Sequence, residues 1–270
     1  MAVLSALRRT PGALRRNPVL FVPVLVITLF QVPQLVLQSV NPLLASIVSL
    51  GLSLVFIFVM PFFQAGIIGM ADEALDGRTS LECFLREGKD NYVSVLVAYL
   101  VLVAVNFAIG FAAVIVAIPI GFAVFSDLRG GVGIAVVAIA GLIAVVVGVA
   151  YLLFILFIQF YGQAIVIDDL GAVDGLEHSY AVVRRDLVSA LGYSVLVGVL
   201  GGLAGAVFAI VSMLVSPQST TLLSLPRLPV VATVGVALLV VVLVALFGGF
   251  FGVYSVAFYR TIDSGVTDGS

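Results

Sequence analysis

Residues 132–166 read VGIAVVAIAGLIAVVVGVAYLLFILFIQFYGQAIV, a run of 35 residues without an acid, a lysine, an arginine or a histidine. A helix needs roughly 20 mostly apolar residues to cross the hydrocarbon core of a bilayer. This run therefore predicts a spanning helix that tilts or projects beyond the core. Five other runs qualify in the same way, so we place six spans at residues 19–38, 43–70, 93–122, 132–166, 190–215 and 229–259.

The composition also points to lipid as the solvent. Of the 270 residues, 63% are hydrophobic and 10% are charged, which is more apolar surface than a soluble core of this length can bury. We predict an all-α fold, a polytopic membrane helical bundle in which residues 1–270 form a single integral membrane domain. The net charge of -2 indicates no nucleic-acid partner. One cysteine and one histidine allow neither an internal disulfide nor a conventional zinc site, so we expect no cofactor and no metal.

The basic residues predict the orientation in the membrane, because cytoplasmic loops retain lysine and arginine. An inside N-terminus leaves only Arg129 and Arg227 outside. It places ten of the twelve basic residues in the cytoplasm, namely Arg8, Arg9, Arg15, Arg16, Arg78, Arg86, Lys89, Arg184, Arg185 and Arg260. We therefore expect a multi-pass protein of the cell membrane with both termini cytoplasmic. The first apolar run is long enough to span and lacks a cleavage site, so we expect no removable signal peptide.

The two inner loops, about residues 71–92 and 167–189, each predict a short amphipathic helix. Thr79 and Glu82 have capping-box spacing in the first loop, and Asp174 and Glu177 repeat it in the second. The apolar residues that follow at helical spacing are expected on the bilayer surface. They are Leu81, Phe84 and Leu85, and then Leu176, Tyr180, Val183 and Leu187. The candidate lipid-headgroup contacts are Arg15, Arg16, Arg184 and Arg185.

An internal repeat is one interpretation of these similarities, and chance alignment of apolar sequence is the other. A shift of 98 residues superposes Phe63 on Tyr161 and Asp76-Gly77 on Asp174-Gly175. The sixth span carries a third version, because Phe250-Phe251-Gly252 matches Phe160-Tyr161-Gly162. The repeat interpretation predicts three hairpins of two spans each.

Polar residues within the spans form a candidate intramembrane face. Three glutamines share one face of the first span, and the full set is Gln31, Gln34, Gln38, Gln64, Asn106, Gln159 and Gln163. An amide that faced lipid would leave hydrogen bonds unsatisfied, so we expect these side chains inside the bundle. Interhelical hydrogen bonding that fixes packing is the favoured interpretation, and the lining of a solute path is the alternative.

Glycines predict close contacts between helices, either within the bundle or in self-association. They are Gly198, Gly201, Gly202 and Gly205 in the fifth span and Gly248 and Gly252 in the sixth.

Catalytic chemistry has one candidate group, which consists of Asp168, Asp169 and Asp174 beside His178. Such a group could hold a magnesium ion against a lipid phosphate. Helix capping and solvated loop charge explain the same residues more simply, so we predict no catalytic residues. None of the predicted spans contains an ionisable residue, which argues against ion-coupled transport.

Three stretches carry a resemblance to a known family. They are Leu14-Arg15-Arg16-Asn17-Pro18, Gln163 to Asp169, and Asp174 to Arg185. With these stretches the chain resembles the uncharacterised six-span membrane proteins of halophilic archaea. Those are distantly similar to the membrane domain fused to some bacterial glycerophosphodiester phosphodiesterases. The resemblance implies a helical domain in the cell membrane and supplies no catalytic residues, because in those fusions a separate soluble domain does the chemistry.

We therefore expect a non-enzymatic scaffold or accessory membrane subunit whose partners are membrane lipids, with a protein partner or a second copy of the chain engaged through the glycine-rich faces. A carrier of a neutral or amphipathic solute or lipid is the first alternative. A lipid-headgroup enzyme is the second.

Overall fold

The computed structural model describes residues 2–30, 37, 41–126, 131–215 and 230–267, and within them all regular structure is helical. Among the described residues, five helices are long and apolar enough to cross a membrane, or six if one bent helix pair is counted as a single span. The long helices are α4 (Pro42–Asp76), α6 (Tyr92–Ser126), α7 (Gly131–Ile158), α10 (Leu187–Val215) and α12 (Val230–Thr267). The predicted all-α, multi-pass membrane architecture is confirmed.

The first predicted span begins with a short 3-10 helix, η1 (Pro18–Leu20), and α2 (Phe21–Leu29). Most of the rest of this span, including Gln31, Gln34 and Gln38, lies outside the described residues. An additional helix, α1 (Ala2–Arg16), precedes it and turns into the η1–α2 segment through a bend of 98°. The two segments are long and apolar enough for a sixth span only if they are counted as one.

The fourth predicted span is present, because residues 138–167 are long and apolar enough to cross a membrane, and it contains a short break that the apolar pattern does not predict. The helix α7 ends at Ile158, and α8 (Tyr161–Ile167) begins after a break at Gln159 and Phe160. Ser179, which is fully buried, stabilises this break. Its hydroxyl accepts a hydrogen bond from the Phe160 amide at 3.1 Å and donates one to the Phe157 carbonyl at 2.8 Å. Backbone groups freed by the break are therefore satisfied within the protein.

Two predicted amphipathic helices are present as α5 (Leu81–Asp90) and α9 (Ala172–Arg185), but their N-termini differ from the prediction. Ser80, not Thr79, caps α5 by accepting from the Cys83 amide at 3.3 Å. The residue before α9 is Gly171, which provides no side-chain cap, and Asp174 lies inside the first turn.

The structure corrects part of the surface assigned to α5 and α9. Phe84 and Val183 are buried in the protein instead of lying on the bilayer surface, whereas Leu81 and Leu85 are exposed. Burial of Phe84 and Val183 leaves each helix a narrower apolar face for lipid than the sequence predicts.

The same order of elements occurs three times along the chain. Each time, a short helix is followed by two further helical segments. The junction residues are Asn17, Asn91 and Asp186, and the amide of each bonds the carbonyl four residues before it. The units are α1 with α2 and α4, α5 with α6 and α7–α8, and α9 with α10 and α12. The 98-residue register is wrong, because Asp76 and Gly77 end α4 whereas Asp174 and Gly175 lie within α9.

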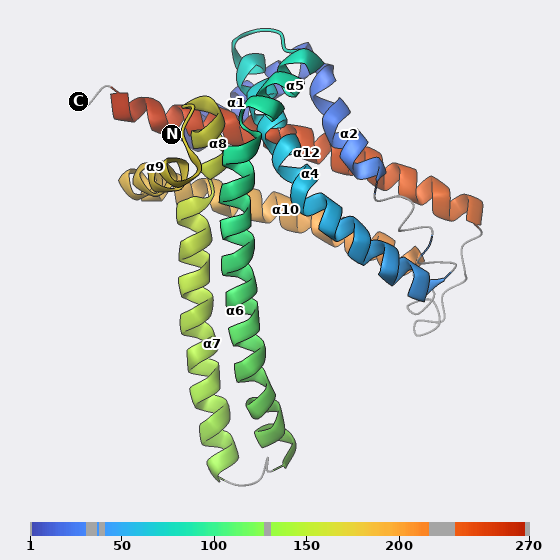
Figure 1. Cartoon of the computed structure of the whole chain (residues 1–270), viewed down its shortest axis with the longest axis vertical. Coiled ribbons are helices and arrows are strands. Elements are labelled where there is room, and N and C mark those ends of the chain that lie inside the picture. The colour runs from blue at the N-terminus through green and yellow to red at the C-terminus, as the bar shows by residue number, and fades with distance from the viewer. Residues whose placement is uncertain (1, 31–36, 38–40, 127–130, 216–229, 268–270) are drawn as a thin grey trace.

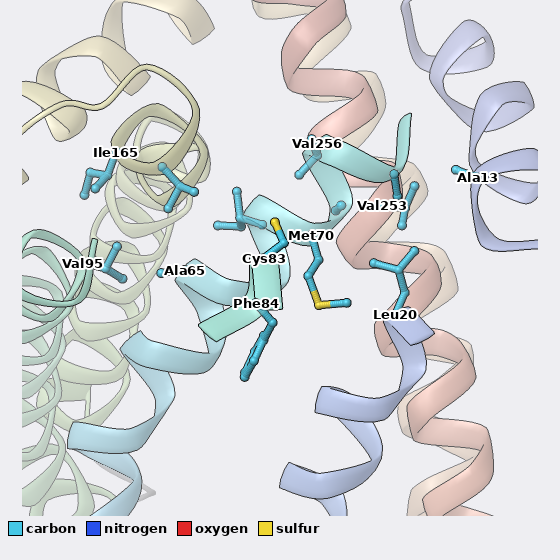
Figure 2. Packing of buried hydrophobic residues seen from close by; sticks show 14 of the residues in the cluster. Ala13, Leu20, Ala65, Met70, Cys83, Phe84, Val95, Ile165, Val253 and Val256 are labelled. Carbon is cyan, nitrogen blue, oxygen red and sulfur yellow. The ribbon is translucent and has the colours of Figure 1, made fainter. Parts of the chain in front are cut away.

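The short helices and the ends of the long helices meet at one side of the molecule, which we call the polar end (Figure 1). There α1 packs on α12, α5 on α4, and α9 on α8. The α6–α7 pair then runs in a different direction from α4, α10 and α12 (Figure 1). A buried core that includes Met70, Phe84, Ile165 and Val253 joins α4, α5, α8 and α12 at this end (Figure 2). Residues of α1, η1 and α6 belong to the same core.

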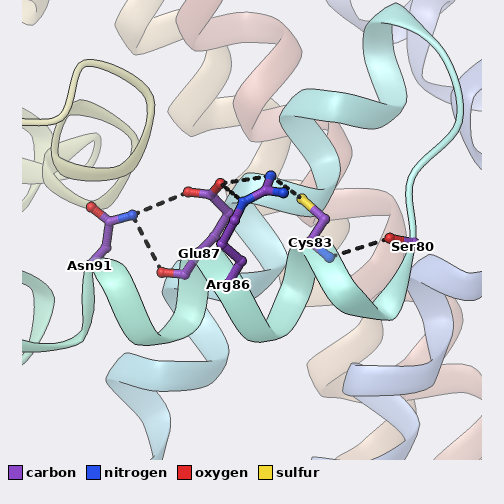
Figure 3. Close-up of polar contacts among 5 residues, drawn as sticks. All are labelled: Ser80, Cys83, Arg86, Glu87 and Asn91. Carbon is purple, nitrogen blue, oxygen red and sulfur yellow. Dashed lines mark hydrogen bonds and ion pairs between the residues drawn. The ribbon is translucent and has the colours of Figure 1, made fainter.

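The contact between α4 and α5 requires a glycine at position 66. A β-carbon there would lie 2.4 Å from a ring carbon of Phe84, closer than side chains approach. On the surface of α5, Arg86 pairs with Glu87, and the Asn91 amide donates to the same carboxylate (Figure 3). These bonds connect α5 to the junction at which α6 begins.

Candidate functional site

A cavity of about 600 Å³ opens at the polar end between α1 and the ends of α4 and α12. Five arginines line it together with an aspartate and three small or apolar residues. The lining residues are Arg8, Arg9, Gly12, Arg15, Arg16, Leu75, Asp76, Ala257 and Arg260. We call this cavity the arginine hollow. It contains two of the predicted headgroup contacts, Arg15 and Arg16, whereas Arg184 and Arg185 lie apart from it at the end of α9.

The orientation of α1 follows from its two faces. Ala6, Thr10 and Ala13 are buried, and the Thr10 hydroxyl donates to the Ala6 carbonyl, so this face needs no further polar partner. Small residues allow a close approach between helices, which fits the packing of α1 on α12. The opposite face carries Arg8, Arg9, Arg15 and Arg16, all exposed.

Asn17 fixes the end of α1 against the end of α4. Its side-chain amide donates to the carbonyls of Ala13 at 3.1 Å and Gly77 at 3.0 Å, and its oxygen accepts from the Thr79 amide at 2.9 Å. The side chain is almost completely buried. This amide therefore sets the relative position of the two walls of the hollow.

Arg260 contributes the far wall through two ion pairs. Its Nε donates to Asp72 at 2.6 Å, and one terminal nitrogen donates to Asp76 at 2.8 Å. This pairing could not be predicted from the sequence, because the aspartates lie 188 and 184 residues away in the chain. Sequence periodicity does not link positions so far apart. The sequence does show Arg260 as a single arginine at the end of a long apolar run.

A second polar group lies close by, where α8, α9 and α12 meet. His178 Nε2 is 3.1 Å from Asp263 and 3.7 Å from Asp168, and the Tyr259 hydroxyl donates to Asp168. Burial raises the pKa of the Asp168 carboxyl, and the hydrogen bond from Tyr259 works in the opposite direction. The donor atoms of Asp168, His178 and Asp263 all lie within 4.8 Å of one another, a spacing that a small cation could bridge.

This group only partly matches the acidic group in the sequence analysis. The structure brings Asp168 and His178 together as considered there, but Asp169 and Asp174 are not members. Asp263 takes their place, and the sequence analysis did not consider it. Asp169 has a left-handed backbone with φ of 52°, which marks a sharp turn after α8.

A family model matches residues 1–262 of the chain. The chain belongs to the family described as Domain of unknown function (DUF7847). Comparison with curated proteins and with solved structures finds no match. The matched residues run from α1 through most of α12, and the family description assigns no activity.

Polar residues in the described spans of this DUF7847 protein bond to one another between helices. The Tyr161 hydroxyl donates to Gln64 at 3.0 Å, and the Tyr151 hydroxyl donates to Asn106 at 2.5 Å. The Ser194 hydroxyl donates to Gln159 at 2.9 Å. These bonds tie α4 to α8, α6 to α7, and the α7–α8 break to α10. Gln163 is buried in α8.

The glycine faces of the DUF7847 chain differ from each other. On α12, a β-carbon at Gly248 would lie 2.7 Å from Val24, so this face closely contacts α2. On α10, a β-carbon at any glycine of the predicted face would meet no atom of the described residues within 4 Å. That face comprises Gly198, Gly201, Gly202 and Gly205.

Proposed function

We propose that this DUF7847 protein is a non-catalytic membrane scaffold or accessory subunit whose polar end lies against anionic lipid headgroups at the cytoplasmic surface. One observation carries the proposal, namely that all three short helices gather at the polar end and expose apolar side chains there. Leu4 of α1 is 62% exposed, Leu85 of α5 is 48% exposed and Val173 of α9 is 65% exposed. Amphipathic helices with this pattern lie in the plane of the interface.

Basic residues at the ends of the short helices support contact with anionic lipid. Arg15 and Arg16 end α1, Lys89 lies in the last turn of α5, and Arg184 and Arg185 end α9. Each basic residue near the surface contributes roughly 1 kcal/mol of attraction to an anionic leaflet. The predicted orientation places all of them in the cytoplasm, where such lipids face them.

The pairing of the intramembrane polar residues favours a scaffold over a carrier. Gln64, Asn106 and Gln159 each accept a hydrogen bond from another helix, as expected for residues that fix packing. The likeness to the membrane domain of some phosphodiesterases agrees with this role, because that domain accompanies a catalytic unit.

A tryptophan reporter tests the proposal, since the chain contains no tryptophan. We would prepare Leu4→Trp, Leu85→Trp and Val173→Trp separately and reconstitute each in nanodiscs with a lipid brominated near the headgroup. Brominated phosphatidylglycerol should quench all three more strongly than brominated phosphatidylcholine.

Val114→Trp serves as the control, because Val114 is exposed on α6 far from the short helices. Its quenching should not depend on the headgroup. If the three reporters show no quenching, or equal quenching by both lipids, the proposed contact with anionic headgroups is wrong.

The Asp168–His178–Asp263 group favours a lipid-headgroup enzyme as the second candidate function. Its carboxylates and imidazole could activate water or hold a divalent cation beside a headgroup. Reconstituted protein with Mg²⁺ or Mn²⁺ should then release a headgroup from phosphatidylglycerol, measured by phosphorus NMR. Asp263→Asn should abolish the release. Activity that survives this substitution would reject the group as its source.

A further inference from the structure

We propose that the arginine hollow binds the phosphate of one anionic lipid headgroup, over Gly12 and between two pairs of arginines. This inference rests on the proposed function, because it requires the polar end to lie at the level of the headgroups. It goes further by assigning a single site with defined residues, whereas the proposed function requires only a general contact with the anionic surface.

The geometry of α1 provides the seat for the phosphate. The pair Arg8 and Arg9 lies about two turns from the pair Arg15 and Arg16, and at about 100° per residue the four fall within roughly 120° of arc. Gly12 lies at the centre of that arc. A β-carbon at Gly12 would meet no atom within 4 Å, so the space between the two arginine pairs is open. A side chain there would occupy the place that the ligand needs.

The four arginines of α1 that line the hollow have no acidic partner among the described residues. Among the described residues none forms an ion pair with Arg8, Arg9, Arg15 or Arg16, and α1 contains no acid. By contrast, α5 and α9 carry acids of their own within the helix. Four unpaired guanidinium groups on one helical face repel one another, and an anion among them removes that repulsion.

Two ion pairs hold the Arg260 side chain in one orientation on the wall opposite α1. Asp72 and Asp76 bind Arg260 through Nε and one terminal nitrogen, which fixes the plane of its guanidinium. A guanidinium has five N–H donors, and these two bonds leave others available to a phosphate. Arginine binds phosphate in a bidentate manner and is more specific for it than a point charge.

The position of the hollow selects a lipid over a free anion. Arg15 and Arg16 end α1 immediately before η1 and α2, where the chain turns into its first apolar segment. Leu75 and Ala257 add apolar surface to the lining, suitable for the glycerol and first methylenes of a lipid. The volume of about 600 Å³ lies in the range of ordinary ligand pockets.

Native mass spectrometry of the full-length protein in detergent tests the site. Phosphatidylglycerol, phosphatidylcholine and inorganic phosphate are the three probes, and the fraction of protein with one bound molecule gives Kd. We expect one phosphatidylglycerol per chain, at least tenfold tighter than phosphatidylcholine. Gly12→Leu should weaken phosphatidylglycerol at least tenfold, while Gly12→Ala, which adds one carbon, should weaken it less than threefold.

Two controls separate the site from general effects. Gly51→Leu places the same side chain at a helical glycine that also has open space around it, and it should leave Kd within twofold. Arg184→Gln removes an exposed arginine from α9 and should also leave Kd within twofold. By contrast, Arg9→Gln combined with Arg15→Gln should abolish the specific binding of phosphatidylglycerol. Leucine favours a helix more than glycine does, so Gly12→Leu should retain its circular dichroism.

Unchanged binding in Gly12→Leu and in the double arginine variant would overturn the site. Inorganic phosphate that binds as tightly as phosphatidylglycerol would overturn the choice of a lipid. Failure of this inference is distinguishable from failure of the proposed function, because the tryptophan reporters on α5 and α9 do not depend on the hollow and should retain their preference for anionic lipid in a Gly12→Leu background.

Discussion

At the scale of single residues, Cys83 gives a direct test of the packing around α5. It is the only cysteine, it is 2% exposed, and burial with the neighbouring Glu73 carboxylate raises its pKa to about 11. Only the thiolate reacts with a maleimide. We therefore expect labelling to be slow at pH 7 and to rise about tenfold per pH unit up to about pH 10, whereas an ordinary thiol starts to level near pH 8.5.

The control for Cys83 is Leu85→Cys in a Cys83→Ser background, because Leu85 is exposed on the same helix. Labelling of Leu85→Cys should be fast at pH 7, and its rate should start to level near pH 8.5, as for an ordinary thiol. A Cys83 profile that coincides with this control would contradict the buried environment.

Asn17 is the residue whose loss should most affect the polar end. Asn17→Ala leaves the Thr79 amide and the Gly77 carbonyl without their partner, and a buried polar group left unsatisfied costs about 1–3 kcal/mol. We expect the free energy of unfolding in detergent to fall by about 2 kcal/mol. Asn41→Ala, which removes an exposed helix cap, should cost about 1 kcal/mol. If the free energy of unfolding falls equally in both variants, Asn17 contributes no more than a helix cap.

At the scale of elements, the packing of α5 on α4 depends on Gly66. In Gly66→Leu, the new side chain would overlap both the ring and the backbone oxygen of Phe84. Overpacking of this kind costs about 1–3 kcal/mol, and we expect α5 to separate from α4. Thermal unfolding measures the destabilisation, and faster maleimide labelling of Cys83 reports the separation. Gly51→Leu, in open space, should change neither measurement.

The elements that the sequence predicts well are those set by the length of an apolar run. Five described crossings follow such runs, and both inner-loop helices were predicted from their spacing. The break at Gln159 and Phe160 is not predicted, because Ser179, which stabilises it, lies 19 residues beyond Phe160 in another helix. The helix α1 was missed because its buried face consists of alanine and threonine, and its arginine pairs were interpreted only as a topology signal.

At the scale of the whole molecule, the candidate site was only half predictable. Arg15 and Arg16 follow from their place before an apolar run. Arg260, Asp72 and Asp263 do not, because their partners come from helices far apart in the chain. The arginine hollow exists only when α1, α4 and α12 meet, and nothing in the local sequence encodes that meeting.

The orientation of the molecule is itself a prediction. A green fluorescent protein fused to the C-terminus should fluoresce, since it folds in the cytoplasm, and alkaline phosphatase at that point should be inactive. Alkaline phosphatase inserted at Arg129 should be active. The opposite pattern would place ten of the twelve basic residues outside and would reject the orientation on which the headgroup contacts depend.

The packing of α1 on α12 also determines the order in which the protein can be completed. About 210 residues separate the end of α1 from the start of α12, so a ribosome needs roughly 10–40 s to make the partner that α1 requires. During that time α1 can already contact α4 and α10, but the face of α1 that packs on α12 has no partner. The contacts of α1 are thus completed only after α12 has been made, and the arginine hollow, which Ala257 and Arg260 of α12 help to line, closes only then.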